Sequence, residues 1–305
     1  MLKCFTIYLY VFLFGNIQLF CEQRDNTLRV DSNPYISGDD FRHLAQFVFD
    51  ETTPYFNPSL VKKGDIVFVR TEPSIENLKF FINILHPQIT EPYILITHNG
   101  DDNVPAQFQS YLSDPKLLVW FGQNGNLVNH PKFIHIPIGF QNRHYQNKYI
   151  EIINELNQLG LNKQKEHLLS LNFDIGTNNT IRKPIYELFK DRSYCYIQGN
   201  KKSNYEYLVD VAKSKFIISP HGHGLDCHRT WEALCLNTFP VVKASTLDVL
   251  YKDLPVLIVN DWQDVTQEFL EQKYKEMIGR QYKTEKLFIK YWADLIMDYQ
   301  KNYKN

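Results

Sequence analysis

Short, continuous apolar runs alternate with helical stretches along most of this sequence. The first half contains four such runs, at residues 65–70, 93–97, 117–121 and 133–137. Continuous runs, unlike runs in which apolar and polar residues alternate, are typical of parallel strands that are covered by helices on both faces. The same alternation restarts after residue 166. We therefore expect an α/β protein with two doubly wound, Rossmann-like domains that face each other across a cleft.

A polar link at residues 160–166 separates the two halves. With 305 residues, the chain is long enough for two domains that each bury a core. We expect domains at residues 25–160 and 161–305, the second closed by an amphipathic C-terminal helix. Residues 22–60 are polar and interrupted by prolines, which is typical of a stem, with one short helix near 41–49.

The chain begins with a leader of different composition. Lys3 precedes an apolar run at residues 4–15, which is shorter than the roughly twenty residues of a membrane-spanning helix and fits a signal-peptide core. We expect residues 1–24 to be a cleaved signal peptide or a signal-anchor, with membrane anchoring through residues 4–20 in the second case. Both lead into the secretory pathway, to the ER or Golgi lumen. The alternative is a buried N-terminal element of a cytosolic protein.

Net charge, cysteine content and one short motif bear on partners, disulfides and glycosylation. The formal net charge of −1 provides no electrostatic footprint for nucleic acid, so no nucleic-acid partner is expected. Beyond the leader the cysteines are Cys195, Cys227 and Cys235, an odd number that indicates no disulfide framework. Asn178 begins an Asn-Asn-Thr acceptor sequence for glycosylation, which is usable only in a lumen and would make the protein a glycoprotein.

The most informative stretch is a strand, a glycine-containing loop and a helix at residues 214–236. Such a loop presents free backbone N–H groups and the positive end of a helix dipole, which bind anions such as phosphate. Arg229 stands in the first helical turn, where its guanidinium can reach a diphosphate. Glu232, one turn further on, can accept hydrogen bonds from ribose hydroxyls. The alternative is an ion pair between these two side chains on the helix surface.

The same loop contains the histidine-rich pattern H-x-H-x-x-D-x-H, formed by His221, His223, Asp226 and His228. Its spacing is one residue longer than that of metallo-β-lactamase-like hydrolases, and no companion ligand motif follows. We therefore expect no metal and no cofactor, and a zinc hydrolase stays a third alternative. Asp226 is interpreted as the N-cap of the following helix. His223 and Gly224 fit either a tight turn or a ligand contact.

A second polar cluster follows the predicted strand at 93–97. Because ligands of such sheets bind beyond the carboxyl ends of strands, this cluster should face the glycine loop across the cleft. His98, Asp101 or Asp102 is then a candidate general base for an acceptor hydroxyl. The alternative is an ordinary connection with an Asn-Gly turn. The sequence contains no Asp-x-Asp, which disfavours transferases that hold a metal on their nucleotide through that motif.

Residues 215–242 resemble the donor-binding segment of exostosin-like glycosyltransferases. That family has a pattern of the form F-x-x-x-P-x-G-x-G-x-D-x-x-R-x-x-E-A-L-x-x-G-x-x-P-V-V, which this chain follows from Phe216 to Val242. Two positions depart from it: Asn237 stands where glycine is usual, and His223 where asparagine is common. Segments at 93–101, 120–124, 135–139, 247–251 and 254–258 also resemble parts of small exostosin-like proteins.

The resemblance implies a GT-B fold and an inverting, metal-independent glycosyltransferase of the secretory pathway, with type II membrane topology. It implies transfer of a sugar from a nucleotide sugar, with UDP as the expected nucleotide, to a glycan or glycoprotein acceptor. Residues 25–160 would be the acceptor-side domain and 161–305 the donor domain. The donor-binding residues implied are His221, Gly222, His223, Gly224, Asp226, Arg229 and Glu232. The expected catalytic residues are His98, Asp101 and Arg229. The alternative is a catalytically inactive nucleotide- or sugar-binding module.

Overall fold

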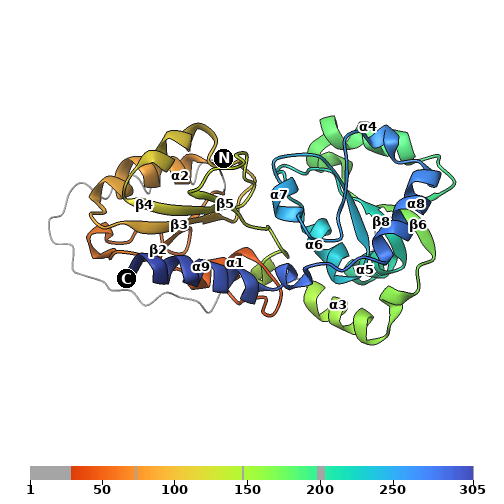
Figure 1. Ribbon diagram of the computed structural model, residues 1–305, viewed down its shortest axis with the longest axis horizontal. Coiled ribbons are helices and arrows are strands. Elements are labelled where there is room, and N and C mark those ends of the chain that lie inside the picture. Colours follow the sequence, from red (N-terminus) through yellow and green to blue (C-terminus); the bar gives the residue numbers. More distant parts are fainter. Residues whose placement is uncertain (1–28, 73, 146–147, 198–202, 305) are drawn as a thin grey trace, which may run out of the picture.

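The computed structural model describes residues 29–72, 74–145, 148–197 and 203–304. The leader expected at residues 1–24 lies outside the described residues. The chain forms two lobes, and each contains a sheet of five strands (Figure 1). The strand pairs of both sheets are parallel. The expected mixed α/β class, with two Rossmann-like parallel sheets, is confirmed.

The first sheet has the strand order β1-β2-β3-β4-β5. Its strands are β1 (Phe47–Phe49), β2 (Ile66–Arg70), β3 (Tyr93–His98), β4 (Leu117–Gly122) and β5 (Phe133–His135). Because the order follows the chain without a reversal, this sheet is wound in one direction and is not doubly wound as expected. Successive right-handed crossovers place their connections on one face, so the other face must be covered by segments from elsewhere in the chain.

Both faces of the first sheet are nevertheless buried. The helices of this lobe are α1 (Gly38–Leu44), α2 (Glu76–Phe80) and α9 (Ile289–Lys304). On β2, Val67 and Val69 pack on the side of α2 and the helical turn that follows it. Ile66 and Phe68 point to the opposite face, where α1 and α9 run beside each other (Figure 1). Residues 38–49, expected to belong to a stem with a helix at 41–49, instead form α1 and β1.

The second sheet has the order β10-β9-β8-β6-β7. Its strands are β6 (His167–Leu171), β7 (Cys195–Ile197), β8 (Ser214–Ile218), β9 (Phe239–Lys243) and β10 (Leu257–Val259). The helices of this lobe are α3 (Tyr149–Gln158), α4 (Asn179–Phe189), α5 (Asn204–Ala212), α6 (His228–Cys235), α7 (Asp248–Tyr251) and α8 (Gln267–Ile278). The order reverses between β6 and β8, as in doubly wound sheets. Ligands of such sheets bind at this reversal.

The division expected at residue 160 differs from the observed packing at two helices. Helix α3 precedes that point but packs on α5 through Ile150 and Ile153, and so belongs with the second sheet. Helix α9, expected to close the second domain, returns to the first sheet, where Tyr299 contacts Phe121 with ring centroids 5.6 Å apart. Apolar stripes on both helices decide these partners, since each stripe must be buried against a sheet or helix.

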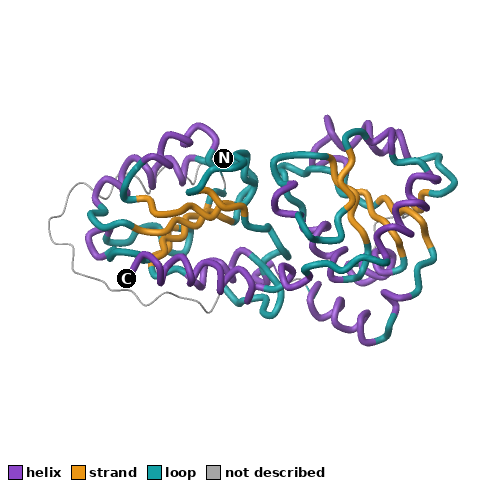
Figure 2. The backbone as a smooth tube through the Cα atoms, viewed as in Figure 1, coloured by secondary structure: helices purple, strands orange, loops and turns teal. Residues whose placement is uncertain are grey.

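The two lobes share part of their core. The apolar cluster beneath the first sheet continues into the second lobe through Ile138, Trp231 and Tyr251. Figure 2 shows the strands of both sheets enclosed between helices, with the loops that join them at the sheet ends. None of the helices in the described ranges is both long and apolar enough to cross a lipid bilayer.

Candidate functional site

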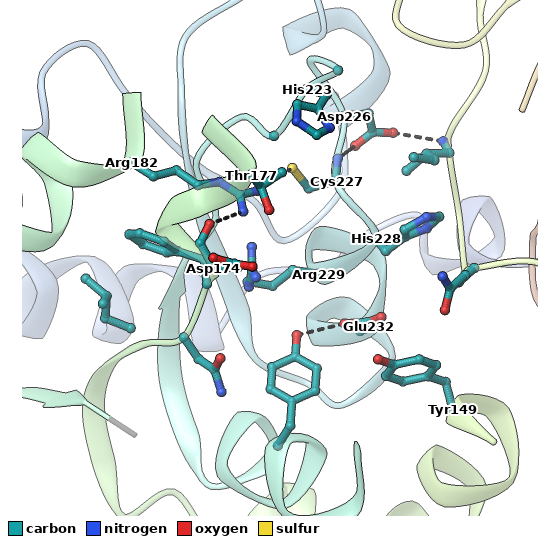
Figure 3. A pocket seen from close by; sticks show the side chains of 18 of the residues that line it. Tyr149, Asp174, Thr177, Arg182, His223, Asp226, Cys227, His228, Arg229 and Glu232 are labelled. Atoms are coloured by element: carbon teal, nitrogen blue, oxygen red, sulfur yellow. Dashed lines mark hydrogen bonds between the residues drawn. The ribbon is translucent and has the colours of Figure 1, made fainter. Parts of the chain in front are cut away.

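A cavity of about 770 Å³ lies where the carboxyl ends of the second sheet meet the first lobe (Figure 3). The segment after β6 contributes Phe173 and Asp174, and the loop after β8 contributes residues 222–224. The first lobe contributes Asp101, which follows β3, and Ile138, which follows β5. The cavity therefore occupies the position at the strand ends where parallel α/β sheets bind their ligands.

The structure brings most of the sequence-predicted site residues to this cavity. Those that line it are Asp101, Gly222, His223, Gly224, Asp226, Arg229 and Glu232. His221 does not line it; its backbone carbonyl accepts a hydrogen bond from the Arg182 Nε. His98 lines a smaller, neighbouring cavity of about 240 Å³ in the first lobe.

Two arginines face the larger cavity, one predicted and one not. The guanidinium carbons of Arg182 and Arg229 lie 5.6 and 5.9 Å from the centroid of the same Phe173 ring. Arg182, on α4, donates to the backbone carbonyls of Asp174 and His221 over 2.8 and 3.0 Å. Arg229 lies in the first turn of α6, and its Nε is buried without a hydrogen-bond partner.

Neither guanidinium forms an ion pair with a carboxylate in the described part of the chain. Burial and the neighbouring charge of Arg229 lower the pKa of Arg182, whereas the charge of Asp174, which lines the same cavity, raises it. Two adjacent cations with unused donors are electrostatically unfavourable unless an anion lies between them. A diphosphate, with its two charged groups, suits forked donors of this kind.

The loop before α6 is shaped by its contact with the first lobe. The Gly222 N–H donates to the Gly224 carbonyl over 3.1 Å. A Cβ on Gly224 would lie 2.5 Å from the Nδ2 of Asn124, so only glycine allows this approach. The Asn178 side chain caps the start of α4 and donates to the Gly222 carbonyl over 2.8 Å. The predicted glycosylation asparagine therefore supports the loop through its own amide.

Asp226 links the two lobes and is not the N-cap that was expected. The N-cap of α6 is Cys227, which makes no side-chain capping bond. The buried Asp226 carboxylate accepts four hydrogen bonds, from the N–H groups of Ile138 and Cys227, the Trp231 Nε1–H and the Tyr251 hydroxyl, at 2.9–3.0 Å. Burial raises its pKa, and these four donors lower it. Because all four donors are protein groups, the carboxylate serves the fold and the lobe contact.

Glu232 is buried at the base of the cavity (Figure 3). Its Oε2 accepts a hydrogen bond from the Tyr207 hydroxyl over 2.7 Å, and burial raises its pKa. Arg229 and Glu232 do not form the ion pair considered as an alternative, since no contact within salt-bridge distance joins these described side chains. Both therefore present polar atoms to the cavity.

His98 and Asp101 differ strongly in their surroundings. The buried His98 ring donates from Nε2 to the Pro137 carbonyl over 2.9 Å, and its Nδ1 accepts from the Asn99 N–H over 2.7 Å. Burial lowers its pKa to about 4. Asp101 is 61% exposed, and its Oδ2 lies 3.6 Å from the Nδ1 of the equally exposed His223. His98 therefore has both ring nitrogens occupied by backbone groups, whereas Asp101 is open to solvent at the cavity mouth.

Two residues of the site were missed by sequence reasoning. Arg182 lies 47 positions before Arg229 and belongs to no motif, so nothing local marks it. His228 was considered only as a metal ligand, yet it is the first residue of α6 and lines both cavities. Its Nδ1–H donates to the Gly139 carbonyl of the first lobe over 2.7 Å. Its place at a helix start after a glycine loop was the available signal.

Three residues of the histidine-rich pattern lie in separate surroundings. Asp226 is enclosed by protein donors, His228 contacts the first lobe and His223 lies at the exposed mouth. Within the described ranges, no group of three or more His, Cys, Asp or Glu side chains is arranged to hold a metal ion.

In comparisons with known proteins, no family model matches this chain and no curated protein matches it significantly.

Proposed function

We propose that this protein is a glycosyltransferase with a GT-B-like arrangement, which transfers a sugar from a nucleoside-diphosphate sugar, such as a UDP-sugar, to a glycan or glycoprotein acceptor. The observation that supports this most is the pair of arginines, Arg182 and Arg229, which share the Phe173 ring and have no carboxylate partner among the described side chains. They face a cavity at the reversal point of a Rossmann-like sheet, where nucleotides bind in such folds.

The residues suggest a division of roles around the donor. The diphosphate would lie between the two guanidiniums and the N-terminus of α6, where positive charge stabilises the departing phosphate. Glu232, held by Tyr207, would accept hydrogen bonds from ribose hydroxyls. In an inverting reaction, an acceptor oxygen attacks the anomeric carbon while the bond to the diphosphate breaks. No metal is required, because the arginines neutralise the leaving group.

The smaller cavity suits the acceptor. Its lining includes four side-chain amides, from Asn99, Gln123, Gln141 and Asn142, together with the exposed ring of Tyr145. The amides of Asn99, Gln123 and Asn142 form hydrogen bonds within the protein, which hold the lining in place. The exposed Tyr145 ring can stack on the ring face of a saccharide. The two cavities adjoin, so a donor in one and an acceptor in the other would meet at their boundary.

The leader favours a location in the secretory pathway, as a Golgi or ER membrane protein or a protein with a cleaved signal. Expression with a C-terminal tag in a eukaryotic cell, followed by protease protection of microsomes, tests this. Protection from protease supports the location, and full digestion without detergent contradicts it.

Thermal-shift titration of the full chain with UDP, GDP, CMP and ADP tests the donor site. Ligand at 100 times Kd should stabilise the protein by about 2.7 kcal/mol. Arg182→Ala and Arg229→Ala should each weaken binding by about 10–100-fold, since a hydrogen bond to a charged group contributes about 1.5–3 kcal/mol. Arg192→Ala is the matched control, because Arg192 is exposed outside the cavity. If no nucleotide shifts the wild type, the proposal is refuted.

Binding without turnover would instead indicate a nucleotide- or sugar-binding module. The discriminating measurement is release of nucleoside diphosphate from a panel of UDP- and GDP-sugars by the wild-type protein. Release that depends on Arg229 supports the enzyme. Nucleotide binding with no release from any donor, with or without added saccharides, supports the module.

A further inference from the structure

One histidine stands at the boundary between the two cavities. The donor-side cavity of about 770 Å³ and the acceptor-side cavity of about 240 Å³ share four lining residues, Asp101, Ile138, Gln141 and His228. His228 is the one contributed by the second lobe, and it is adjacent in sequence to Arg229. Figure 3 shows its ring directed away from α6, toward the backbone segment of the first lobe. A group in this position is within reach of both a bound donor and a bound acceptor.

The Gly139 carbonyl fixes the orientation of the His228 ring and the tautomer of its neutral form. Its Nδ1 lies 2.7 Å from the Gly139 carbonyl oxygen, which can only accept, so Nδ1 carries the proton. The proton-free nitrogen of the neutral ring is therefore Nε2. No hydrogen bond to Nε2 is formed by any other described residue. Such a ring, oriented by a backbone carbonyl and with Nε2 available, has the geometry of a general base.

The other two candidates for this role are less suited. His98 uses both ring nitrogens for backbone hydrogen bonds and is buried. Asp101 is 61% exposed at the cavity mouth and lies 3.6 Å from the exposed His223, so solvent competes with an acceptor for its carboxylate. Charged and titratable groups line both cavities together with His228. From the second lobe they include Asp174, Asp226, Arg229 and Glu232 with the phenols of Tyr149 and Tyr207, and from the first lobe Arg29, Arg70, Glu72, His98, Asp101 and Tyr145.

We propose that His228 is the general base of this site, an assignment that rests on the proposed glycosyl transfer. Its Nε2 takes the proton of the acceptor hydroxyl as the acceptor oxygen forms its bond to the anomeric carbon. The bond from that carbon to the diphosphate breaks, and the electron pair leaves with the diphosphate, which Arg182 and Arg229 neutralise. The proton then passes from His228 to solvent. The first turn of α6 thus supplies both the base and one of the leaving-group cations.

Two substitutions of His228 distinguish a role as general base from a role in positioning. His228→Asn places an amide N–H near the position of Nδ1, so it keeps a donor for the Gly139 carbonyl but removes the base. His228→Gln places an amide near the position of Nε2 and removes the Gly139 hydrogen bond. His130→Gln is the matched control, because His130 lies in a first-lobe loop outside both cavities.

The assay measures nucleoside-diphosphate release from UDP-glucose, UDP-N-acetylglucosamine, UDP-galactose, UDP-glucuronate, UDP-xylose and GDP-mannose, with water and added saccharides as acceptors. We expect kcat to fall by about 10²–10⁴-fold in both variants, with nucleotide Kd within about twofold of the wild type. Turnover retained in both variants overturns the proposal. Activity in His228→Asn alone shows a positioning role and also overturns it.

A measurement on the resting protein tests the same assignment without a donor. Nitrogen-15 NMR of histidine-labelled protein reports which ring nitrogen carries the proton, and the signal missing from His228→Asn identifies His228. A protonated Nδ1 and an unprotonated Nε2 in the neutral ring support the proposal, and the opposite form overturns it. If the wild type binds no nucleotide and releases none from any donor, the glycosyl-transfer proposal fails first, and the assignment of the base fails with it.

Discussion

Removal of the Asp226 carboxylate should destabilise the protein more than any single surface change. Asp226→Ala leaves three donors beyond the adjacent Cys227 without their acceptor: the Ile138 N–H, the Trp231 Nε1–H and the Tyr251 hydroxyl. Each buried, unsatisfied donor costs about 1–3 kcal/mol. Because such losses in one network are not additive, we expect a total of about 3–5 kcal/mol. That is a large share of the roughly 5–15 kcal/mol that stabilises a typical domain.

The corresponding change in melting temperature follows from chain length. With about 2.1 cal/mol/K of unfolding entropy per residue, 305 residues have about 0.6 kcal/mol/K. A loss of 4 kcal/mol should therefore lower Tm by about 6–7 °C. Thermal unfolding followed by tryptophan fluorescence measures this shift, since the buried Trp231 is itself a partner of Asp226.

Two variants serve as references for Asp226→Ala. Asp226→Asn keeps the shape but turns an N–H₂ group toward donors, so we expect it to be destabilised to a lesser extent than the alanine variant. Asp298→Ala removes an exposed carboxylate of α9, 3.7 Å from Lys301, and should change stability by less than about 0.5 kcal/mol. If the free energy of unfolding of Asp226→Ala is within about 1 kcal/mol of that of the wild type, these hydrogen bonds do not stabilise the fold and the lobe contact as described.

The remaining predictions concern acid stability and the glycine loop. Burial lowers the pKa of His98 to about 4 in the folded protein, against 6.5 in the unfolded chain. Its contribution to the free energy of unfolding is therefore complete above pH 6.5 and is lost as the pH falls toward 4. At about 1.4 kcal/mol per pH unit, wild type should lose about 3 kcal/mol more than His98→Gln between pH 7 and 4, as measured by urea denaturation; equal losses would contradict this. Gly224→Ala should destabilise by about 1–3 kcal/mol, because Asn124 must move and release its bond to the Asp226 N–H. A Tm equal to that of the wild type would show that Asn124 moves at no cost.

Much of the fold follows from local patterns. Continuous apolar runs predicted β2 to β5 of the first sheet and the strand before the glycine loop, because a strand buried on both faces needs apolar residues at every position. The order of the strands in each sheet does not follow from local patterns. The winding of the first sheet in one direction depends on which element covers its second face, and that element, α9, lies at the opposite end of the chain.

The candidate site also has a part that the sequence predicts and a part that only the tertiary structure shows. The sequence alone places Arg229 and Glu232 one turn apart at the start of a helix after a glycine loop, since these are short-range relations along the chain. It does not reveal that Arg182 stands beside Arg229, that Asp226 bonds to Ile138, or that His98 is enclosed by backbone groups. Those pairs are separated by tens of residues, and only the packing of lobes and layers brings them together. Local periodicity thus determined the elements, and tertiary packing decided which of their polar side chains are buried in structural bonds and which face the cavity.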